Sequence, residues 1–446
     1  MSSNILLKTI KEYRKNTEEN ALIKLARNAA IRGEITDLAM DWEAFRKIDH
    51  TFSDMVRGQL KVTNQKSSGR CWGFAGLNLF RVYLGRKYNL KQFEFSQSYF
   101  MFWDKIEKSN FFLENIIKTS TEPFNSRIIM HLVENPIQDG GQWDMFVNLI
   151  RKYGVVPQTE MPESFQSSKS MRMNRMITRK LREFAKTLRD AHNKGKELTT
   201  LHRMKKEMLA VVYQMLVIHL GTPPARFDWQ VRDKDKKFHR FENLSPKRFF
   251  SDHVGLKLED FVCLINCPMS DKTYNEVYTV KYLGNVLEGE IIRYLNLPSS
   301  RLKESAVQSI RDDAPVWFGC DVGKHFHRDL GIMDMDLFDF ELFYGTSFPM
   351  SKGDRLEYGD SQMTHAMLFT GVDLDKKGKP RKWRVENSWG DKRGDKGYDI
   401  MTDKWFDEYN YEVVVHKKYL TKEELEIYQR NPIKLQPWDP MGALAI

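Results

Sequence analysis

The chain has 446 residues, of which 41% are hydrophobic and 12% aromatic. Its 70 basic and 60 acidic residues give a net charge of +10. This length allows about three domains, and the aromatic content excludes disorder as a description of the whole chain. The four cysteines are too few for a disulfide framework, which favours a reducing compartment. The polar N-terminal residues give no export signal, and no segment has the roughly 20 apolar residues of a membrane span, so we expect a cytoplasmic protein.

The first part of the chain is predicted to be helical. Apolar residues recur at spacings of three and four from Ile5 to Ala26, which indicates an N-terminal helical arm over residues 1–60. A polar, glycine-containing loop follows at residues 62–70. From Cys71 to Tyr88 apolar residues occupy nearly every face, which is typical of a buried helix that begins at the cysteine.

The excess positive charge is confined to residues 166–260, which hold 22 basic and 11 acidic residues. Between 169 and 208, apolar residues lie at helical spacing among 13 basic and 4 acidic residues. This pattern predicts an inserted helical hairpin with one apolar and one basic face. Its charge is open to two interpretations, weak sequence-independent binding of nucleic acid or contact between subunits.

Beyond residue 260 the pattern changes to short β-type runs. These runs are separated by Gly, Pro, Asp and Asn turns, which favours a largely antiparallel sheet. The clearest of them are residues 261–265, 316–320, 366–371 and 382–386.

Four residues could form a site for nucleophilic catalysis by cysteine. Cys71 opens a helix, where free N–H groups and the helix dipole favour a thiolate. His365 begins a β-type run and could act as the base, and Asn387 could hold its imidazole by accepting the Nδ1–H. Trp389 could shield that bond from water, and the Gln65 amide could donate to an oxyanion together with the backbone N–H of Cys71.

The motifs around these residues resemble a known family. Residues 65–75, with Cys71-Trp72-Gly73-Phe74-Ala75, look like the nucleophile segment of papain-type cysteine peptidases. Thr364-His365-Ala366 and Asn387-Ser388-Trp389-Gly390 resemble its histidine and asparagine segments. Gly140 and Gly141 resemble the paired glycines of its substrate cleft, where a peptide can bond to backbone that no Cβ covers. The basic insertion and the C-terminal sequence resemble the branch of bleomycin hydrolase and bacterial aminopeptidase C.

This resemblance implies an α+β papain-like fold with two lobes, a helical one and an antiparallel β one, and an inserted helical subdomain. It also implies a cysteine aminopeptidase that acts on peptides with a free N-terminus, forms a homohexamer and needs no metal or organic cofactor. The expected division is an N-terminal arm (1–60), a helical lobe with Cys71 (61–165), the basic insertion (166–260), a β lobe with His365 and Asn387 (261–430) and a C-terminal arm (431–446).

The small residues at the C-terminus suggest how access could be limited. A tail from Gly442 to Ile446 can lie extended in a peptide-binding groove and present its terminal carboxylate to the α-ammonium of a substrate. Ala445 and Ile446 are therefore predicted to contact substrate, and in the family the last residue can be trimmed by the enzyme itself. The alternative is an endopeptidase whose arm is displaced.

Other polar residues are given structural roles. Cys263 and Cys267 have no second pair of ligands, so a zinc site is not expected. His325 and His327 lie in a polar segment, and they are interpreted as solvated.

Overall fold

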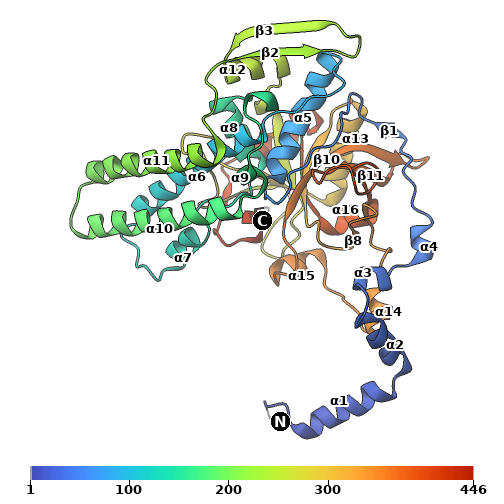
Figure 1. Cartoon of the computed structure of the whole chain (residues 1–446). Coiled ribbons are helices and arrows are strands. Elements are labelled where there is room, and N and C mark those ends of the chain that lie inside the picture. Colours follow the sequence, from blue (N-terminus) through green and yellow to red (C-terminus); the bar gives the residue numbers. More distant parts are fainter. Residues whose placement is uncertain (1–2, 445–446) are drawn as a thin grey trace.

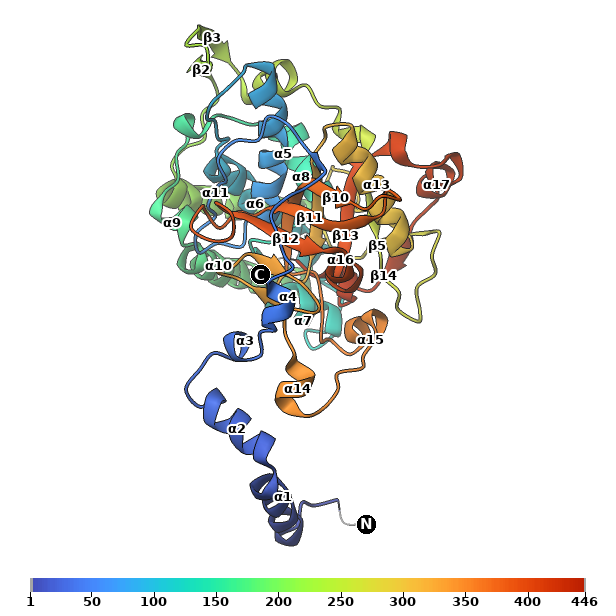
Figure 2. The same ribbon diagram turned by 90° about the vertical axis from the view of Figure 1, so that its right-hand side faces the viewer.

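The computed structural model of the chain describes residues 3–444. The N-terminal arm projects from the body as a string of helices (Figures 1 and 2). Helices α1 and α2 contain no buried residue. The arm contacts the body from α2 onward. Helix α2 lies against residues 340–344, the Asp41 N–H donates to the Leu337 carbonyl at 2.8 Å, and β1 pairs with β10. Its elements are α1 (Leu7–Glu19), α2 (Ala21–Ala30), α3 (Ile35–Leu38), α4 (Trp42–Phe45) and β1 (Asp54–Met55).

The helical lobe is built around α5 (Cys71–Lys87), which is buried on nearly every side, as its apolar sequence predicts. Two glycines of α5 allow neighbouring helices to pack closely. A Cβ at Gly73 would lie 2.4 Å from the Phe100 ring, and one at Gly76 would lie 2.5 Å from the Phe146 ring. The neighbouring elements are α6 (Gln97–Lys118), α7 (Arg127–Glu134), α8 (Trp143–Tyr153) and η1 (Gln158–Glu160).

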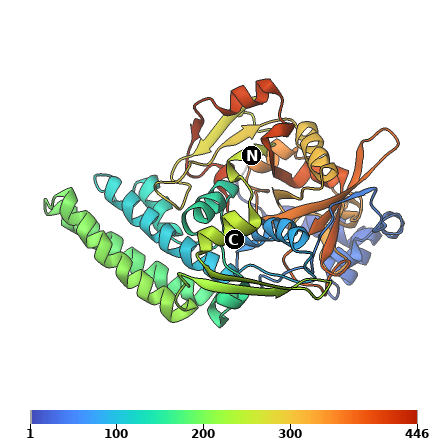
Figure 3. The ribbon, with the colours of Figure 1, turned by 90° about the horizontal axis from the view of Figure 1, so that it is seen from above.

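Residues 166–260 include the two long helices that their periodicity predicts, α10 and α11, seen in green beyond the body in Figure 3. They pack on each other and on α6. A β-hairpin that the helical pattern did not indicate follows, with Trp229 stacked on Phe241 at 5.2 Å between ring centroids. The elements are α9 (Phe165–Ser168), α10 (Met171–Asn193), α11 (Leu198–Leu220), β2 (Phe227–Arg232), β3 (Phe238–Leu244), α12 (Pro246–Phe249), η2 (Phe250–Val254) and η3 (Leu258–Asp260).

Some of the basic residues of α10 cap other helices. Arg182 donates to the carbonyls of Val133 and Glu134 at the end of α7. Arg189 donates to the carbonyls of Thr119 and Glu122, just beyond α6. Helix C-terminal carbonyls lack intrahelical partners, so these arginines satisfy acceptors within the fold. The charge of α10 is therefore only partly available to a partner.

The β lobe is formed by one large sheet, whose strands run in the order β14-β5-β6-β4-β13-β7-β10-β11-β12-β9-β8. Its central strands pair antiparallel, as predicted, whereas β4·β6, β12·β9 and β14·β5 are parallel pairs. Its elements are β4 (Phe261–Ile265), β5 (Glu276–Val280), β6 (Tyr294–Asn296), α13 (Ser299–Arg311), β7 (Val316–Cys320), β8 (Phe326–His327), β9 (Ile332–Met333), α14 (Phe340–Tyr344), α15 (Lys352–Glu357), β10 (His365–Leu374), β11 (Pro380–Glu386), β12 (Tyr398–Thr402), α16 (Asp403–Tyr409), β13 (Asn410–His416), η4 (Lys417–Tyr419) and α17 (Lys422–Tyr428).

The C-terminal arm begins as an edge strand of this sheet. Strand β14 (Ile433–Leu435) pairs with β5, and η5 (Pro440–Gly442) follows. The arm then returns toward the helical lobe, where Met441 and Leu444 are buried.

Two large hydrophobic clusters and a small third one lie in the described residues, and the helices and strands that form them confirm the predicted α+β fold. The largest joins the helical lobe to residues 166–260 and to strands of the β lobe, and the second lies mainly within the β lobe. Cys71 and Ala366 both belong to the largest cluster, so the two lobes meet at the cysteine. Within residues 3–444, no helix is long and apolar enough to cross a membrane.

Candidate active site

The loop before Cys71 is fastened to the segment that contains Asn387. The backbone N–H of Gln65 donates to the Ser388 carbonyl at 2.8 Å, and the N–H of Gly390 donates to the Thr63 carbonyl at 2.9 Å. Gly390 has a φ of +80°, and a Cβ there would lie 2.5 Å from the Asn64 amide. Residues 63–65 and 388–390, more than 300 positions apart, therefore form one wall of the site.

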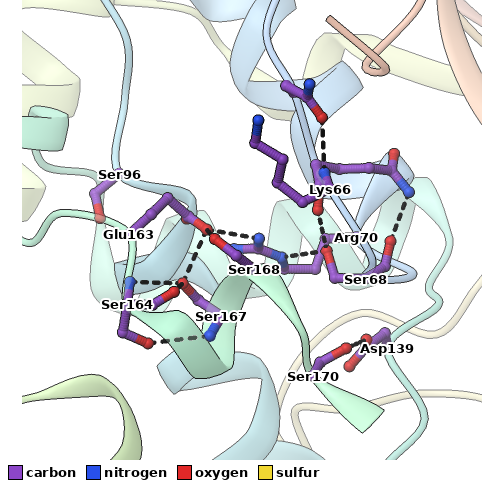
Figure 4. Close-up of polar contacts among 12 residues, drawn as sticks. Lys66, Ser68, Arg70, Ser96, Asp139, Glu163, Ser164, Ser167, Ser168 and Ser170 are labelled. Atoms are coloured by element: carbon purple, nitrogen blue, oxygen red, sulfur yellow. Dashed lines mark hydrogen bonds and ion pairs between the residues drawn. The ribbon is translucent and has the colours of Figure 1, made fainter.

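Cys71 is the first residue of α5, and its side chain is buried. The guanidinium of Arg70, next to it, does not point to solvent. It forms a two-pronged ion pair with the Glu163 carboxylate, with N–O distances of 2.9 and 2.7 Å. Figure 4 shows these two side chains turned toward each other, close to the serines of α9. This pair fixes the start of the helix that carries the cysteine.

The imidazole of His365 is held by Asn387. Its Nε2 lies 3.0 Å from the Asn387 Oδ1, which also accepts from the Ser388 N–H at 2.8 Å. Since an amide oxygen only accepts, Nε2 carries the proton and Nδ1 is left free. The predicted pairing of Asn387 with Nδ1–H is therefore wrong as to the nitrogen, although the structure does bring the two residues into contact. The Trp389 ring packs against the imidazole, with its centroid 4.9 Å from that of His365.

Burial is the largest influence on the pKa values of both Cys71 and His365. It raises the pKa of Cys71 to about 12, although hydrogen bonds from the backbone N–H groups of Ala366 and Trp72 act in the opposite direction. Because Ala366 follows His365 in β10, this contact brings the sulfur next to the histidine. Burial also lowers the pKa of His365 to about 4. Burial therefore opposes the thiolate that the start of the helix was predicted to favour.

The Gln65 side chain is fixed at both ends of its amide. Its Nε2 donates to the Ser68 carbonyl at 2.6 Å, and its Oε1 accepts from the Ser388 hydroxyl at 2.6 Å. An amide nitrogen has two hydrogens, so one remains available for an oxyanion. The site thus contains Gln65, Cys71, His365 and Asn387, all of them buried.

Gly140 and Gly141 lie in a segment that is anchored by two buried lysines of α6. Lys108 donates to the Gly140 carbonyl at 2.6 Å, and Lys105 forms an ion pair with Asp139 at 2.6 Å. A Cβ at residue 141 would lie 2.6 Å from the Trp72 ring. Packing against the residue that follows Cys71 is therefore a second reason for glycine here, besides the predicted access for a peptide.

The C-terminal arm reaches the same segment. Gln142 donates from Nε2 to the Ala443 carbonyl at 2.9 Å. A cavity of about 410 Å³ separates the arm from the loop that leads to His365, with His131, Gln362 and Trp438 in its lining. The predicted substrate contacts Ala445 and Ile446 lie outside the described residues.

Two further contacts hold the arm. The buried Lys272 ammonium lies 2.8 Å from the Asp439 carboxylate and 2.9 Å from that of Asp271. The Arg127 guanidinium stacks 3.8 Å above the Trp438 ring.

Sequence reasoning missed several residues that support the site: Asp399, Glu163, Lys105, Lys108 and Gln142. Asp399 accepts from the Asn387 amide nitrogen at 2.9 Å. Polar and charged residues are normally exposed, and no local pattern in this sequence marks these five for burial or for contact with the site.

The cysteines that were given structural roles are buried, and His325 and His327 are partly buried, so the interpretation of the histidines as solvated is wrong. Within residues 3–444 no group of three or more His, Cys, Asp or Glu could hold a metal ion. Cys263 and Cys267 are buried free thiols, and His327 lies 3.1 Å from Asp37 of the N-terminal arm.

Known proteins resemble this chain along nearly its whole length. The Peptidase C1-like family matches residues 4–442. Aminopeptidase C of Listeria innocua is 45% identical over 446 residues, with full coverage of both chains. Human bleomycin hydrolase is 44% identical over 429 residues, which cover 94% of each chain. The crystal structure of PepW from Lactobacillus rhamnosis HN001 is 43% identical, covers all of both chains and gives a TM-score of 0.98.

Proposed function

We propose a Cys71–His365–Asn387 acyl-enzyme mechanism for this chain, which belongs to the Peptidase C1-like family and is a cysteine aminopeptidase. The observation that supports it is the hydrogen bond that leaves His365 Nδ1 free beside a cysteine at the start of α5. No step requires a metal or an organic cofactor.

His365 Nδ1 takes the proton of the Cys71 thiol as the sulfur attacks the scissile carbonyl. The resulting oxyanion accepts from the free Gln65 Nε2–H and from the Cys71 backbone N–H. The imidazolium then protonates the leaving amine, and the C–N bond breaks to give a thioester. Water, deprotonated by His365, releases the acid and restores the thiol. Asn387 and Trp389 hold the imidazole in place through both half-reactions.

Substitution of the nucleophile tests this mechanism. In Cys71→Ala, hydrolysis of aminoacyl-β-naphthylamides should fall by about four orders of magnitude or more, with the melting temperature little changed. EDTA should leave the wild-type rate unchanged, since no step uses a metal. Activity that survives in the Ala variant would overturn the proposal.

The C-terminal arm is proposed to make the enzyme an aminopeptidase. Its contacts with Gln142 and Lys272 support a tail that fills the groove, so that only a short N-terminal portion of a substrate can enter. Deletion of residues 442–446 should then allow cleavage of N-acetylated peptides, which the full chain should reject. The alternative, an endopeptidase with a displaced arm, predicts equal cleavage of free and acetylated peptides by the full chain.

Trimming of Ile446 by the enzyme itself is a further part of this proposal. Mass spectrometry should find the residue retained in Cys71→Ala and absent from the wild type. Retention in both proteins would exclude trimming.

We also propose a homohexamer and a cytoplasmic setting. The exposed apolar residues of α1 and α2 support assembly, and four free buried cysteines suit a reducing compartment.

Weak nucleic-acid binding is a second candidate activity, because Arg172, Arg175 and Arg179 form an exposed row along α10. In a salt titration the binding constant should fall as the salt concentration rises, with a log–log slope of about −0.7 to −0.9 per contacted phosphate. Binding that ignores salt would exclude this activity.

A further inference from the structure

The residue that holds His365 is itself held by a carboxylate outside the proposed catalytic set. Asp399 lies on β12, and its Oδ2 accepts from the Asn387 Nδ2 at 2.9 Å. The same amide presents Oδ1 to His365 and to the Ser388 N–H. All polar atoms of the Asn387 side chain are therefore engaged.

We propose that Asp399 is a positioning residue, which fixes the Asn387 amide with its oxygen toward the His365 imidazole. Oxygen and nitrogen of an amide can exchange places by a half-turn of the side chain, and a turned Asn387 would present N–H groups to the Nε2–H of His365. The Asp399 oxygen that faces Asn387 accepts a hydrogen bond in the structure, so Asp399 favours the amide nitrogen at that position. The inference rests on the proposed Cys71–His365–Asn387 mechanism.

The surroundings of Asp399 favour this role over a structural one. Its side chain is 3% exposed, and Asn387 is its one hydrogen-bond partner among the described residues. Burial of a carboxylate is unfavourable unless several groups compensate it. Here burial raises the pKa of Asp399 to about 7, while the Asn387 hydrogen bond and the charge of Arg393 lower it less. A carboxylate kept in such a place does not serve the stability of the fold.

Two glycines in tight turns lie next to the Asp399 carboxylate. A Cβ at Gly331 would lie 2.6 Å from the Asp399 Oδ1, and one at Gly394 would lie 2.9 Å from it. The absence of a side chain at these two positions leaves room for the carboxylate beside Asn387. The geometry therefore directs Oδ2 to the amide nitrogen.

Asp399→Leu removes the acceptor at similar volume, and it should lower kcat by about tenfold, the low end for outer partners of site residues. KM and the melting temperature should change little. Asp399→Asn keeps an acceptor oxygen and should retain more of kcat. Asp334→Asn is the control, since it removes another buried carboxylate of the β lobe that makes no contact with the site.

A double-mutant cycle separates positioning from a general effect. If Asp399 acts through Asn387, Asp399→Leu should have no further effect on kcat in an Asn387→Ala background. An undiminished loss in that background, wild-type kcat in Asp399→Leu, or failure of both Asp399 variants to fold would overturn the inference. Wild-type kcat in Asn387→Ala alone would instead overturn the proposed mechanism, so the two failures are distinguishable.

Discussion

The two ends of the chain differ in how much of their surface finds a partner within the protomer. In the C-terminal arm, Met441 and Leu444 are buried, and Asp439 is paired with Lys272. In the N-terminal arm, Leu7 is 82% exposed and Leu25 is 68% exposed. An end that fits a groove of its own protomer can control access to that protomer's site. An end with unmatched apolar side chains is suited to contact another molecule.

The largest effect is expected from loss of the N-terminal arm. Deletion of residues 1–32 should convert the proposed homohexamer to monomers, because it removes the exposed apolar faces of α1 and α2. Light scattering after size-exclusion chromatography would measure the mass. Leu22→Lys with Leu25→Lys should act in the same direction, whereas Lys24→Gln on the same helix should not. An unchanged mass in the deletion would show that this arm does not assemble the protein.

A smaller effect should follow from weakening the contacts that hold the C-terminal arm. Asp439→Asn removes the arm's charge from the buried Lys272 and should weaken seating of the arm by about 2 kcal/mol, as for hydrogen bonds to charged groups. Cleavage of N-acetylated peptides should then rise relative to cleavage of free peptides. Asp271→Asn is the matched control, because it contacts the same lysine from an exposed position outside the arm. Equal effects of the two variants would show that Lys272 does not act through the arm.

The smallest effect is expected from loss of the stacking contact between Arg127 and Trp438 of the C-terminal arm. Trp438→Ala should weaken seating of the arm by about 1 kcal/mol, in the range for a cation–π pair, and raise cleavage of acetylated peptides only slightly. Trp42→Ala removes an exposed tryptophan from the other arm and should leave the ratio of the two cleavages unchanged. A change of that ratio in Trp42→Ala would contradict the idea that the C-terminal arm, and not the N-terminal arm, controls access to the site.

Local patterns predicted the parts of this protein that depend on neighbouring residues. The buried helix at Cys71, the two long helices of residues 166–260 and the strand at His365 all follow from periodicity. The motifs also identified His365 and Asn387 as partners. They did not predict which imidazole nitrogen bonds to Asn387, because that depends on how β10 and the end of β11 are placed in space.

Long-range contacts explain what the sequence did not show. Asp399 and Glu163 look like ordinary surface charges in their own segments, and only the fold buries Asp399 beside Asn387 and places the partly buried Glu163 against Arg70. The basic composition of α10 likewise gave no sign that Arg182 and Arg189 cap neighbouring helices. Composition counts charges, but it does not show which of them are already paired.

The burial of Cys71 also bears on how long such an enzyme survives. Oxidants attack the thiolate far more readily than the thiol, and they need access to the sulfur. Cys71 is 1% exposed and burial raises its pKa to about 12, so the thiol is protected on both counts. The burial that limits access to the sulfur therefore also shields the nucleophile from peroxide.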